Sequence, residues 1–235
     1  MQGQSVWGDL LYGIDNQKSI SDTWFIVNLA EVVGAQSRRP SGLLGRLMGL
    51  LMNWRHRPLS KWTIKLMNIQ ADDFVLDIGC GGGMAVKKIA KIATSGFVAG
   101  IDYSEIMVQQ ALRHNAAAVG AMRVAIKNGS ISNLPFKDES FDKAYAIESF
   151  NFWPDPIAGL KEVHRVLRPR GMVAIVTGWS REIPNQQKYV ALARKMHFSL
   201  YSGSQIVEML NAAGFPQARF TVKAGKHWLC AIGVK

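Results

Sequence analysis

The sequence predicts an α/β fold, a doubly wound sheet whose short apolar strands alternate with amphipathic helices. The first observation is the apolar run 74–78, which leads directly into four glycines within residues 79–83. The second is the segment 84–94, whose apolar residues recur at helical spacing beside three lysines. A strand, a tight glycine turn and a helix in direct succession are typical of a ligand-binding unit in such a fold. The third is the pair of apolar runs at 218–223 and 227–234, which fits a closing hairpin.

The glycine turn has the form Asp77-x-Gly79-x-Gly81-x-Gly83. A dinucleotide-binding turn would need another glycine at Met84 or Val86, and a phosphate-binding P-loop would need a Gly-Lys-Ser/Thr ending. Neither feature is present, so the turn matches neither class of site. A carboxylate at the end of the strand would oppose a phosphate but would favour a cationic ammonium or sulfonium ligand.

The composition indicates one globular domain with an added cap. The 235 residues are 48% hydrophobic and 19% charged. The net charge of +11 admits anionic substrates, nucleic acid or an anionic membrane surface, and selects none of them. Two cysteines, Cys80 and Cys230, cannot build a disulfide framework or a zinc cluster and favour a cytoplasmic setting. The first residues lack a signal-peptide layout, and the most apolar window, 43–54, is too short to span a bilayer.

The segment before the glycine turn has a basic and apolar character. No acidic residue occurs between position 36 and Asp72, while seven basic residues do: Arg38, Arg39, Arg46, Arg55, Arg57, Lys61 and Lys65. A glycine-containing apolar helix is predicted over 42–54, and Pro58 fits the first turn of the next helix, which runs to about residue 68. Such a segment either contacts a membrane surface or a lipid-like substrate, or forms a cap helix with a solvated basic rim.

The rest of the chain continues the alternation of strands and helices. Strands are predicted over 96–102, 122–126, 140–148 and 172–177, and helices over 105–112, 156–166, 186–199 and 204–213. Ser104 and Asp155 are expected to cap helix N-termini, and Gly214 is expected to end a helix. Since parallel strands bind ligands beyond their carboxyl ends, Asp102, Glu148 and the loop 149–153 are candidates for the site.

These motifs, in this order, resemble those of class I S-adenosylmethionine (SAM)-dependent methyltransferases, specifically the methyltransferase type 11-like family. The resemblance covers roughly residues 60–180 and rests on the glycine turn, on Gly100-Ile-Asp-Tyr-Ser-Glu105 and on Val166-Leu-Arg-Pro-Arg-Gly171. It implies a Rossmann-like, seven-stranded sheet, mostly parallel with a C-terminal antiparallel hairpin. It also implies an N-terminal helical cap over 1–70 before a SAM-binding domain over 71–235.

The resemblance further implies which residues hold SAM. Asp77, Gly79, Gly81 and Gly83 would hold the methionine part and Asp102 the ribose. Tyr103, Ser130 and Ile131 would contact the adenine, and Ser130 stands where the family typically has an acid. The complete expected cofactor set is Asp77, Gly79, Cys80, Gly81, Gly83, Asp102, Tyr103, Met107, Gly129, Ser130, Ile131 and Glu148.

The expected chemistry is methyl transfer by alignment of an acceptor with the sulfonium, since proximity and orientation alone supply ~7–11 kcal/mol. Glu148 and Asn151 are the candidates for a catalytic role, although Glu148 fits a purely cofactor-binding role equally well. Tyr12, Trp24 and Trp153 are candidate substrate contacts, with ordinary packing as the alternative. His197 is expected to be structural, and no cluster of metal ligands is visible, so no metal is expected.

The predicted function is SAM-dependent methylation of O, N or C in a small organic molecule, with S-adenosylhomocysteine as product. The loop after 148 lacks the Asn-Pro-Pro-Tyr-like and paired-cysteine signatures of base-methylating branches, so nucleic acid is not the expected acceptor. One alternative is a lipid methyltransferase that contacts a membrane through residues 38–65. The other is a non-catalytic SAM-binding scaffold or regulator. The sequence is equally compatible with a monomer and with a homodimer.

Overall fold

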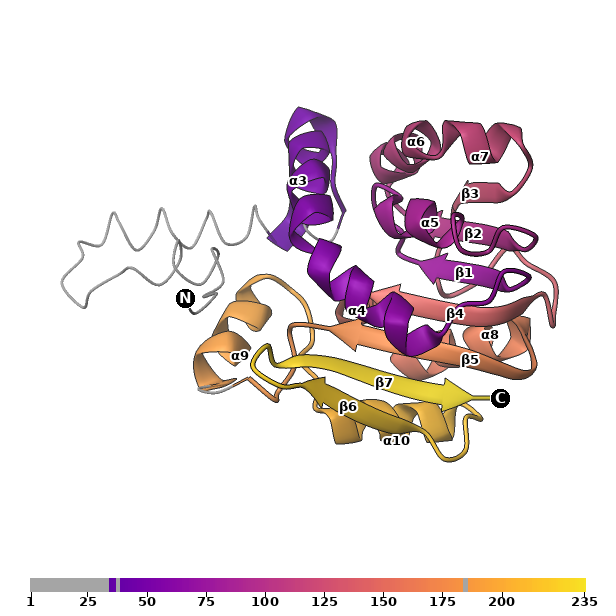
Figure 1. Ribbon diagram of the computed structural model, residues 1–235. Helices are drawn as coiled ribbons and strands as arrows, with labels where there is room; N and C mark the ends of the chain where they lie inside the picture. The colour runs from indigo at the N-terminus through magenta and orange to yellow at the C-terminus, as the bar shows by residue number, and fades with distance from the viewer. Residues whose placement is uncertain (1–33, 37–38, 184–185) are drawn as a thin grey trace.

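The computed structural model describes residues 34–36, 39–183 and 186–235, and their architecture is a three-layer α/β fold (Figure 1). One seven-stranded sheet has the order β3-β2-β1-β4-β5-β7-β6. Its strands are β1 (Phe74–Ile78), β2 (Phe97–Asp102), β3 (Val124–Asn128), β4 (Phe141–Ile147), β5 (Leu167–Thr177), β6 (Arg219–Lys223) and β7 (Trp228–Val234). The pairs among β1 to β5 are parallel, and β7 runs antiparallel to both β5 and β6. This confirms the predicted Rossmann-like sheet with its C-terminal antiparallel hairpin.

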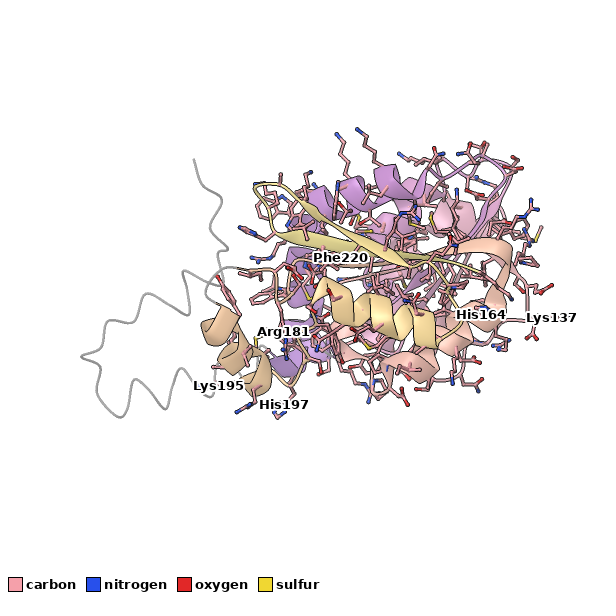
Figure 2. The ribbon with its side chains drawn as sticks, turned by 90° about the horizontal axis from the view of Figure 1, so that it is seen from below. Lys137, His164, Arg181, Lys195, His197 and Phe220 are labelled. Carbon is pink, nitrogen blue, oxygen red and sulfur yellow. The ribbon has the colours of Figure 1, made fainter. Side chains whose placement is uncertain are left out.

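Helices cover both faces of this sheet. They are α3 (Gly42–Arg55), α4 (Arg57–Met67), α5 (Met84–Ile89), α6 (Glu105–His114), α7 (Ala116–Gly120), α8 (Pro156–Val166), α9 (Gln186–Lys195) and α10 (Gly203–Ala212), with a 3₁₀ turn η1 (Phe150–Phe152). One apolar core joins one sheet face to α8 and α10, and a second joins the other face to α4, α5 and α6. Strands buried on both faces explain the continuous apolar runs of the sequence. Figure 2 shows α10 lying along the β6–β7 hairpin beside Phe220.

Helix caps fix where three of these helices begin. The Ser104 hydroxyl accepts the Met107 N–H at the start of α6, and the Asp155 carboxylate accepts the Ala158 N–H at the start of α8. Ser202 caps α10 in a capping box with Gln205, two residues before the predicted start of that helix. The predictions at Ser104 and Asp155 therefore agree with the structure.

Several predicted boundaries differ from the structure. The strand predicted over 172–177 begins at Leu167, and the helix predicted over 186–199 ends at Lys195. The third strand begins at Val124 and not at Met122, because Met122 has φ of 56° and an 84% exposed side chain, and so lies in a turn. The helix predicted over 84–94 ends at Ile89, after which the chain closes through tighter turns, with the Ile92 N–H donating to the Ile89 carbonyl. Ala90 and Ala93, beyond the end of this helix, are still buried, as the periodicity indicated.

The described part of the N-terminal segment packs on the sheet domain. Leu59 and Met67 of α4 are buried in the same core as Val75 of β1. The division at residue 70 stays a prediction, and the candidate substrate contacts Tyr12 and Trp24 lie outside the described residues. Within the described part of the chain, none of the helices is long and apolar enough to cross a bilayer.

Candidate active site

A cavity of about 940 Å³ opens beyond the carboxyl ends of β1, β2 and β4, on the side where α3 stands (Figure 1). Its size is typical of a site for a cofactor and a small ligand. Thirteen of the sequence-predicted site residues line it: Asp77, Gly79, Cys80, Gly81, Asp102, Tyr103, Met107, Gly129, Ser130, Ile131, Glu148, Asn151 and Trp153. Gly83 does not, since a Cβ there would meet Ala111 and Asn115 behind the turn.

The glycine turn presents bare backbone to this cavity. Gly79 and Gly81 have φ of 77° and 51°, in the left-handed region that other residues rarely adopt. A Cβ on Gly79 would meet the Ser149 side chain at 2.5 Å, whereas a Cβ on Gly81 would meet no protein atom within 4 Å. Gly79 is therefore required by packing, and Gly81 leaves open space on the cavity side for a ligand.

Asp102 connects β2 to the glycine turn. One carboxylate oxygen accepts the Gly81 N–H and the other accepts the Ser104 N–H, both at 2.9 Å. A carboxylate has about four lone-pair positions, so each oxygen retains capacity for a further donor such as a hydroxyl. Burial raises the pKa of Asp102, and the two backbone N–H groups oppose that rise.

Asp77 lies deeper, at the carboxyl end of β1, with 3% of its surface exposed. The Tyr145 hydroxyl, from β4, donates to Asp77 Oδ2 at 2.6 Å. Burial raises the pKa of Asp77 to about 7, the Tyr145 hydrogen bond lowers it, and the charge of Asp102 raises it further. Because the carboxylate form is disfavoured without a partner, a cation brought close to Asp77 would promote its ionisation.

Glu148 follows β4 with a strained backbone, φ of 58°. Its carboxyl accepts the Gly178 N–H at 2.7 Å and the Thr177 hydroxyl at 3.3 Å. Burial raises the pKa of Glu148 to about 7, while these two hydrogen bonds and the positive charge of Arg55 on α3 lower it. Glu148 is thus a carboxyl group that can exchange a proton near neutral pH at the cavity wall.

The comparisons with known proteins agree with this geometry. Residues 76–175 match the family model described as a methyltransferase domain. The chain carries a methyltransferase domain. It is 34% identical to "O-methyltransferase resE" of Aspergillus sclerotiorum over 66% of this chain and 59% of that protein. It is 29% identical to the demethylmenaquinone methyltransferase of Listeria welshimeri over 79% of this chain and 86% of that protein.

A solved structure supports the fold assignment. The chain superposes on a SAM-dependent methyltransferase from Aquifex aeolicus with a TM-score of 0.61 and 23% identity, over 74% of this chain and 88% of that one. The residues of the methyltransferase fit SAM as a cofactor, because the cavity holds the bare turn at Gly81, the spare acceptor capacity of Asp102 and the buried carboxyl of Asp77.

The part of the cavity that lies after β2 and β3 is lined by small and partly apolar groups. Ser130 Oγ accepts the Ser132 N–H at 3.2 Å and lies beside buried Ile131. Tyr103 is 39% exposed, and the Arg39 guanidinium lies 5.6 Å from the centre of its ring. A flat aromatic ligand could lie between such apolar surfaces, with the hydroxyl of Ser130 as its polar partner.

Asn151 and Trp153 lie in the loop after β4 and differ in their surroundings. The Asn151 amide donates to the Trp179 carbonyl at 2.8 Å, and its backbone carbonyl accepts the Ser199 N–H, which ties this loop to the segment after α9. Trp153 is only 8% exposed and packs on Phe150 with ring centres 4.9 Å apart. Most of the Trp153 ring therefore belongs to the core, and a small part of it reaches the cavity.

Sequence reasoning missed several lining residues that come from distant segments. His56 and Ser60 reach the cavity from the start of α4, and His197 reaches it from the turn after α9, where Figure 2 labels it. Burial lowers the pKa of His56 to about 4, and the charge of Arg55 lowers it further, so this imidazole is neutral at physiological pH. No local motif marks these residues, since only the folded chain brings them to the site.

Proposed function

We propose that this methyltransferase moves the methyl group of SAM to an O, N or C atom of a small, partly apolar organic molecule. The observation that carries the proposal is a cavity that is continuous from the glycine turn and Asp102 to Glu148 and Asn151. One part of it suits the cofactor, and the remainder suits a small acceptor. The printed names of the two relatives, an O-methyltransferase and a demethylmenaquinone methyltransferase, support a small organic acceptor.

In this proposal Asp77 and the open backbone at Gly81 hold the methionine part of the cofactor, and Asp102 accepts the ribose hydroxyls. Tyr103, Ser130 and Ile131 flank the adenine. When bound, SAM supplies a methyl group already activated by a sulfonium. The protein then has to exclude water and hold the acceptor atom in line with that methyl, which is catalysis by proximity and orientation.

Glu148 is the proposed base for acceptors that must lose a proton. Its pKa of about 7 leaves a substantial carboxylate fraction at neutral pH, and burial makes that carboxylate a stronger base than an exposed one. Neutral His56 also lies on the cavity wall, but its lowered pKa makes it a weaker base than Glu148. Acceptors with an already nucleophilic atom would need neither group.

Calorimetric titration with SAM, S-adenosylhomocysteine and NAD tests the cofactor half. We expect micromolar binding of the first two and none of NAD, and at least about tenfold weaker binding in Asp102→Ala, because a charge-assisted acceptor is lost. Asp72→Ala removes an exposed carboxylate and is the matched control. Binding of NAD alone, or unchanged SAM affinity in a folded Asp102→Ala protein, would overturn the assignment.

A pH–rate profile tests the acceptor half, once a screen of phenols, quinols and amines has provided a substrate. If Glu148 is the base, kcat rises with pH through about 7, because the carboxylate is the active form. Glu148→Gln should remove this rise and lower kcat by about 10²–10⁴-fold. A Glu148→Gln protein that keeps the rise would restrict Glu148 to a positioning role. Tight SAM binding without turnover on any acceptor class would favour the scaffold alternative.

A further inference from the structure

The two faces of α3 differ in side-chain size. Gly45 and Gly49 form its inner face, where a Cβ on Gly49 would meet Met107 of α6 at 2.5 Å. Leu47, Leu50 and Trp54 are 64%, 50% and 65% exposed. At 100° per residue these three side chains point about opposite to the two glycines. We call them the outer stripe. A helix with apolar residues on all sides is normally buried by other parts of the protein or by a ligand on all sides. We therefore expect the outer stripe to be covered by a binding partner.

A group of cations comes from α4, the helix that follows α3, and from α5, which packs against α4. Arg57 begins α4 three residues after Trp54, Lys61 lies one turn further on, and Lys88 comes from α5. The charges of Arg57 and Lys61 both lower the pKa of Lys88, after burial as the larger cause, which places the three cations close together. None of the three forms an ion pair with an acidic residue of the described chain. We call these residues the basic cluster.

We propose that the outer stripe and the basic cluster dock this protein on an anionic membrane surface. A row of Leu and Trp side chains beside Lys and Arg is the arrangement by which interfacial helices insert apolar groups below lipid headgroups and hold anionic ones electrostatically. The net charge of +11 attracts the whole chain to such a surface. Charge complementarity therefore favours lipid over a second copy of this cationic chain, which would be repelled.

The proposed docking surface lies close to the candidate active site, which links membrane binding to catalysis. Gly49 and Met52 of α3 line the cavity, as do His56 and Ser60 at the start of α4. Apart from Lys88 of α5, the proposed docking surface is thus built on α3 and α4, the two helices that border the candidate active site. On the proposed function, acceptors that dissolve in the membrane would have to pass α3 and α4 to reach the cavity, which extends that function to lipid-phase molecules.

Co-sedimentation of the full-length protein with phosphatidylcholine vesicles, with and without phosphatidylglycerol, tests the basic cluster. We expect binding to the anionic vesicles that falls with added salt. Arg57→Glu/Lys61→Glu should weaken it by at least about tenfold. Lys137→Glu/Lys161→Glu makes the same charge change on two exposed lysines and should bind as the wild type. Lys137 lies at the end of the molecule opposite α9 (Figure 2), and Lys161 is on α8, which packs on the other face of the sheet from α4.

A second pair of variants tests the outer stripe. Leu47→Glu/Leu50→Glu should lose vesicle binding to a similar extent, because charged side chains cannot enter the apolar layer. Met122→Glu/Ile157→Glu also replaces two exposed apolar side chains and should leave binding unchanged. Absence of wild-type binding to anionic vesicles, or equal binding by the stripe variant and its control, would overturn the proposal.

The outer stripe could be covered by a membrane, by a second copy of the protein or by another part of the same chain. Sedimentation velocity and thermal unfolding distinguish these three possibilities. If Leu47→Glu/Leu50→Glu abolishes self-association but not vesicle binding, the stripe is an interface between copies. If it lowers the unfolding temperature without changing vesicle binding, the chain itself covers the stripe. Both results overturn the proposal. SAM titration without vesicles keeps the two proposals apart, because vesicle binding can fail while SAM binding remains intact.

Discussion

Replacing Asp77 by Asn should stabilise the unliganded protein and weaken its binding of SAM. Asp77 of β1 is buried at the cavity wall, and its pKa is raised from an ordinary 3.8 to about 7, chiefly by burial. A carboxyl group with a raised pKa binds more protons in the folded than in the unfolded state between these two values. Stability therefore falls as the pH rises through that window, and the loss is complete above pH 7.

The size of the effect follows from the two pKa values. The difference between 3.8 and about 7 corresponds to about 4 kcal/mol of unfolding free energy at pH 8. The amide introduced by Asp77→Asn would be neutral and can keep a hydrogen bond with the Tyr145 hydroxyl, so this variant should recover most of that energy. The gain should narrow to about 2 kcal/mol at pH 5 and vanish below about pH 4, where the wild-type carboxyl is protonated in both states.

Urea denaturation followed by circular dichroism at pH 8, 5 and 4 measures this difference. Asp72→Asn makes the same chemical change on an exposed side chain and serves as control. Calorimetry on the same proteins should show weaker SAM binding by Asp77→Asn, because a neutral amide cannot balance a cation. An Asp77→Asn protein that is no more stable than the wild type at pH 8 would refute the reasoning from burial.

Three smaller changes test other parts of the structure. Gly81→Ala and Gly225→Ala place a Cβ at positive φ with no protein atom within 4 Å, so both should lose similar stability, but only Gly81→Ala should weaken SAM binding in calorimetry. Arg170 has φ of 65°, and Arg170→Gly should raise the free energy of unfolding in urea by about 1 kcal/mol, because glycine adopts this conformation without strain. Asp155→Ala removes the cap of α8 and should lower the free energy of unfolding by about 1 kcal/mol, visible as a lower Tm.

The sequence predicted those features that depend on local chemistry. The turn of Gly79 and Gly81 needs positive φ, which its glycines indicate, and the carboxylates of Asp77 and Asp102 end apolar strands that can be recognised by periodicity. Because parallel strands bring their carboxyl ends to one edge, the two carboxylates could be expected at one site. The start of β3 was wrong by two residues because Met122 is apolar yet exposed, a pattern that periodicity alone misreads.

Features that depend on contacts between distant segments could not be predicted. The pKa of Glu148 is set by burial, by Gly178 after β5 and by Arg55 at the end of α3, and neither residue is its neighbour in sequence. The hydroxyl of Tyr145 reaches Asp77 only because β1 and β4 are adjacent in the sheet. His197 fits a helical pattern and was expected to be structural, whereas the turn after α9 carries it to the cavity.

The family match covers the proposed cofactor contacts but only part of the remaining cavity wall. The groups proposed for the cofactor, from Asp77 to Glu148, all lie within the matched residues 76–175. The remaining walls include residues from 35–60 and 197–199, outside the match. A family that uses one methyl donor for many acceptors needs a donor site that stays constant and an acceptor site that can change. The sheet can provide the first, while the helices before it, such as α3 and α4, can differ between members and provide the second. Selectivity for the acceptor should therefore respond to substitutions at Met52 and Ser60 that leave SAM affinity unchanged.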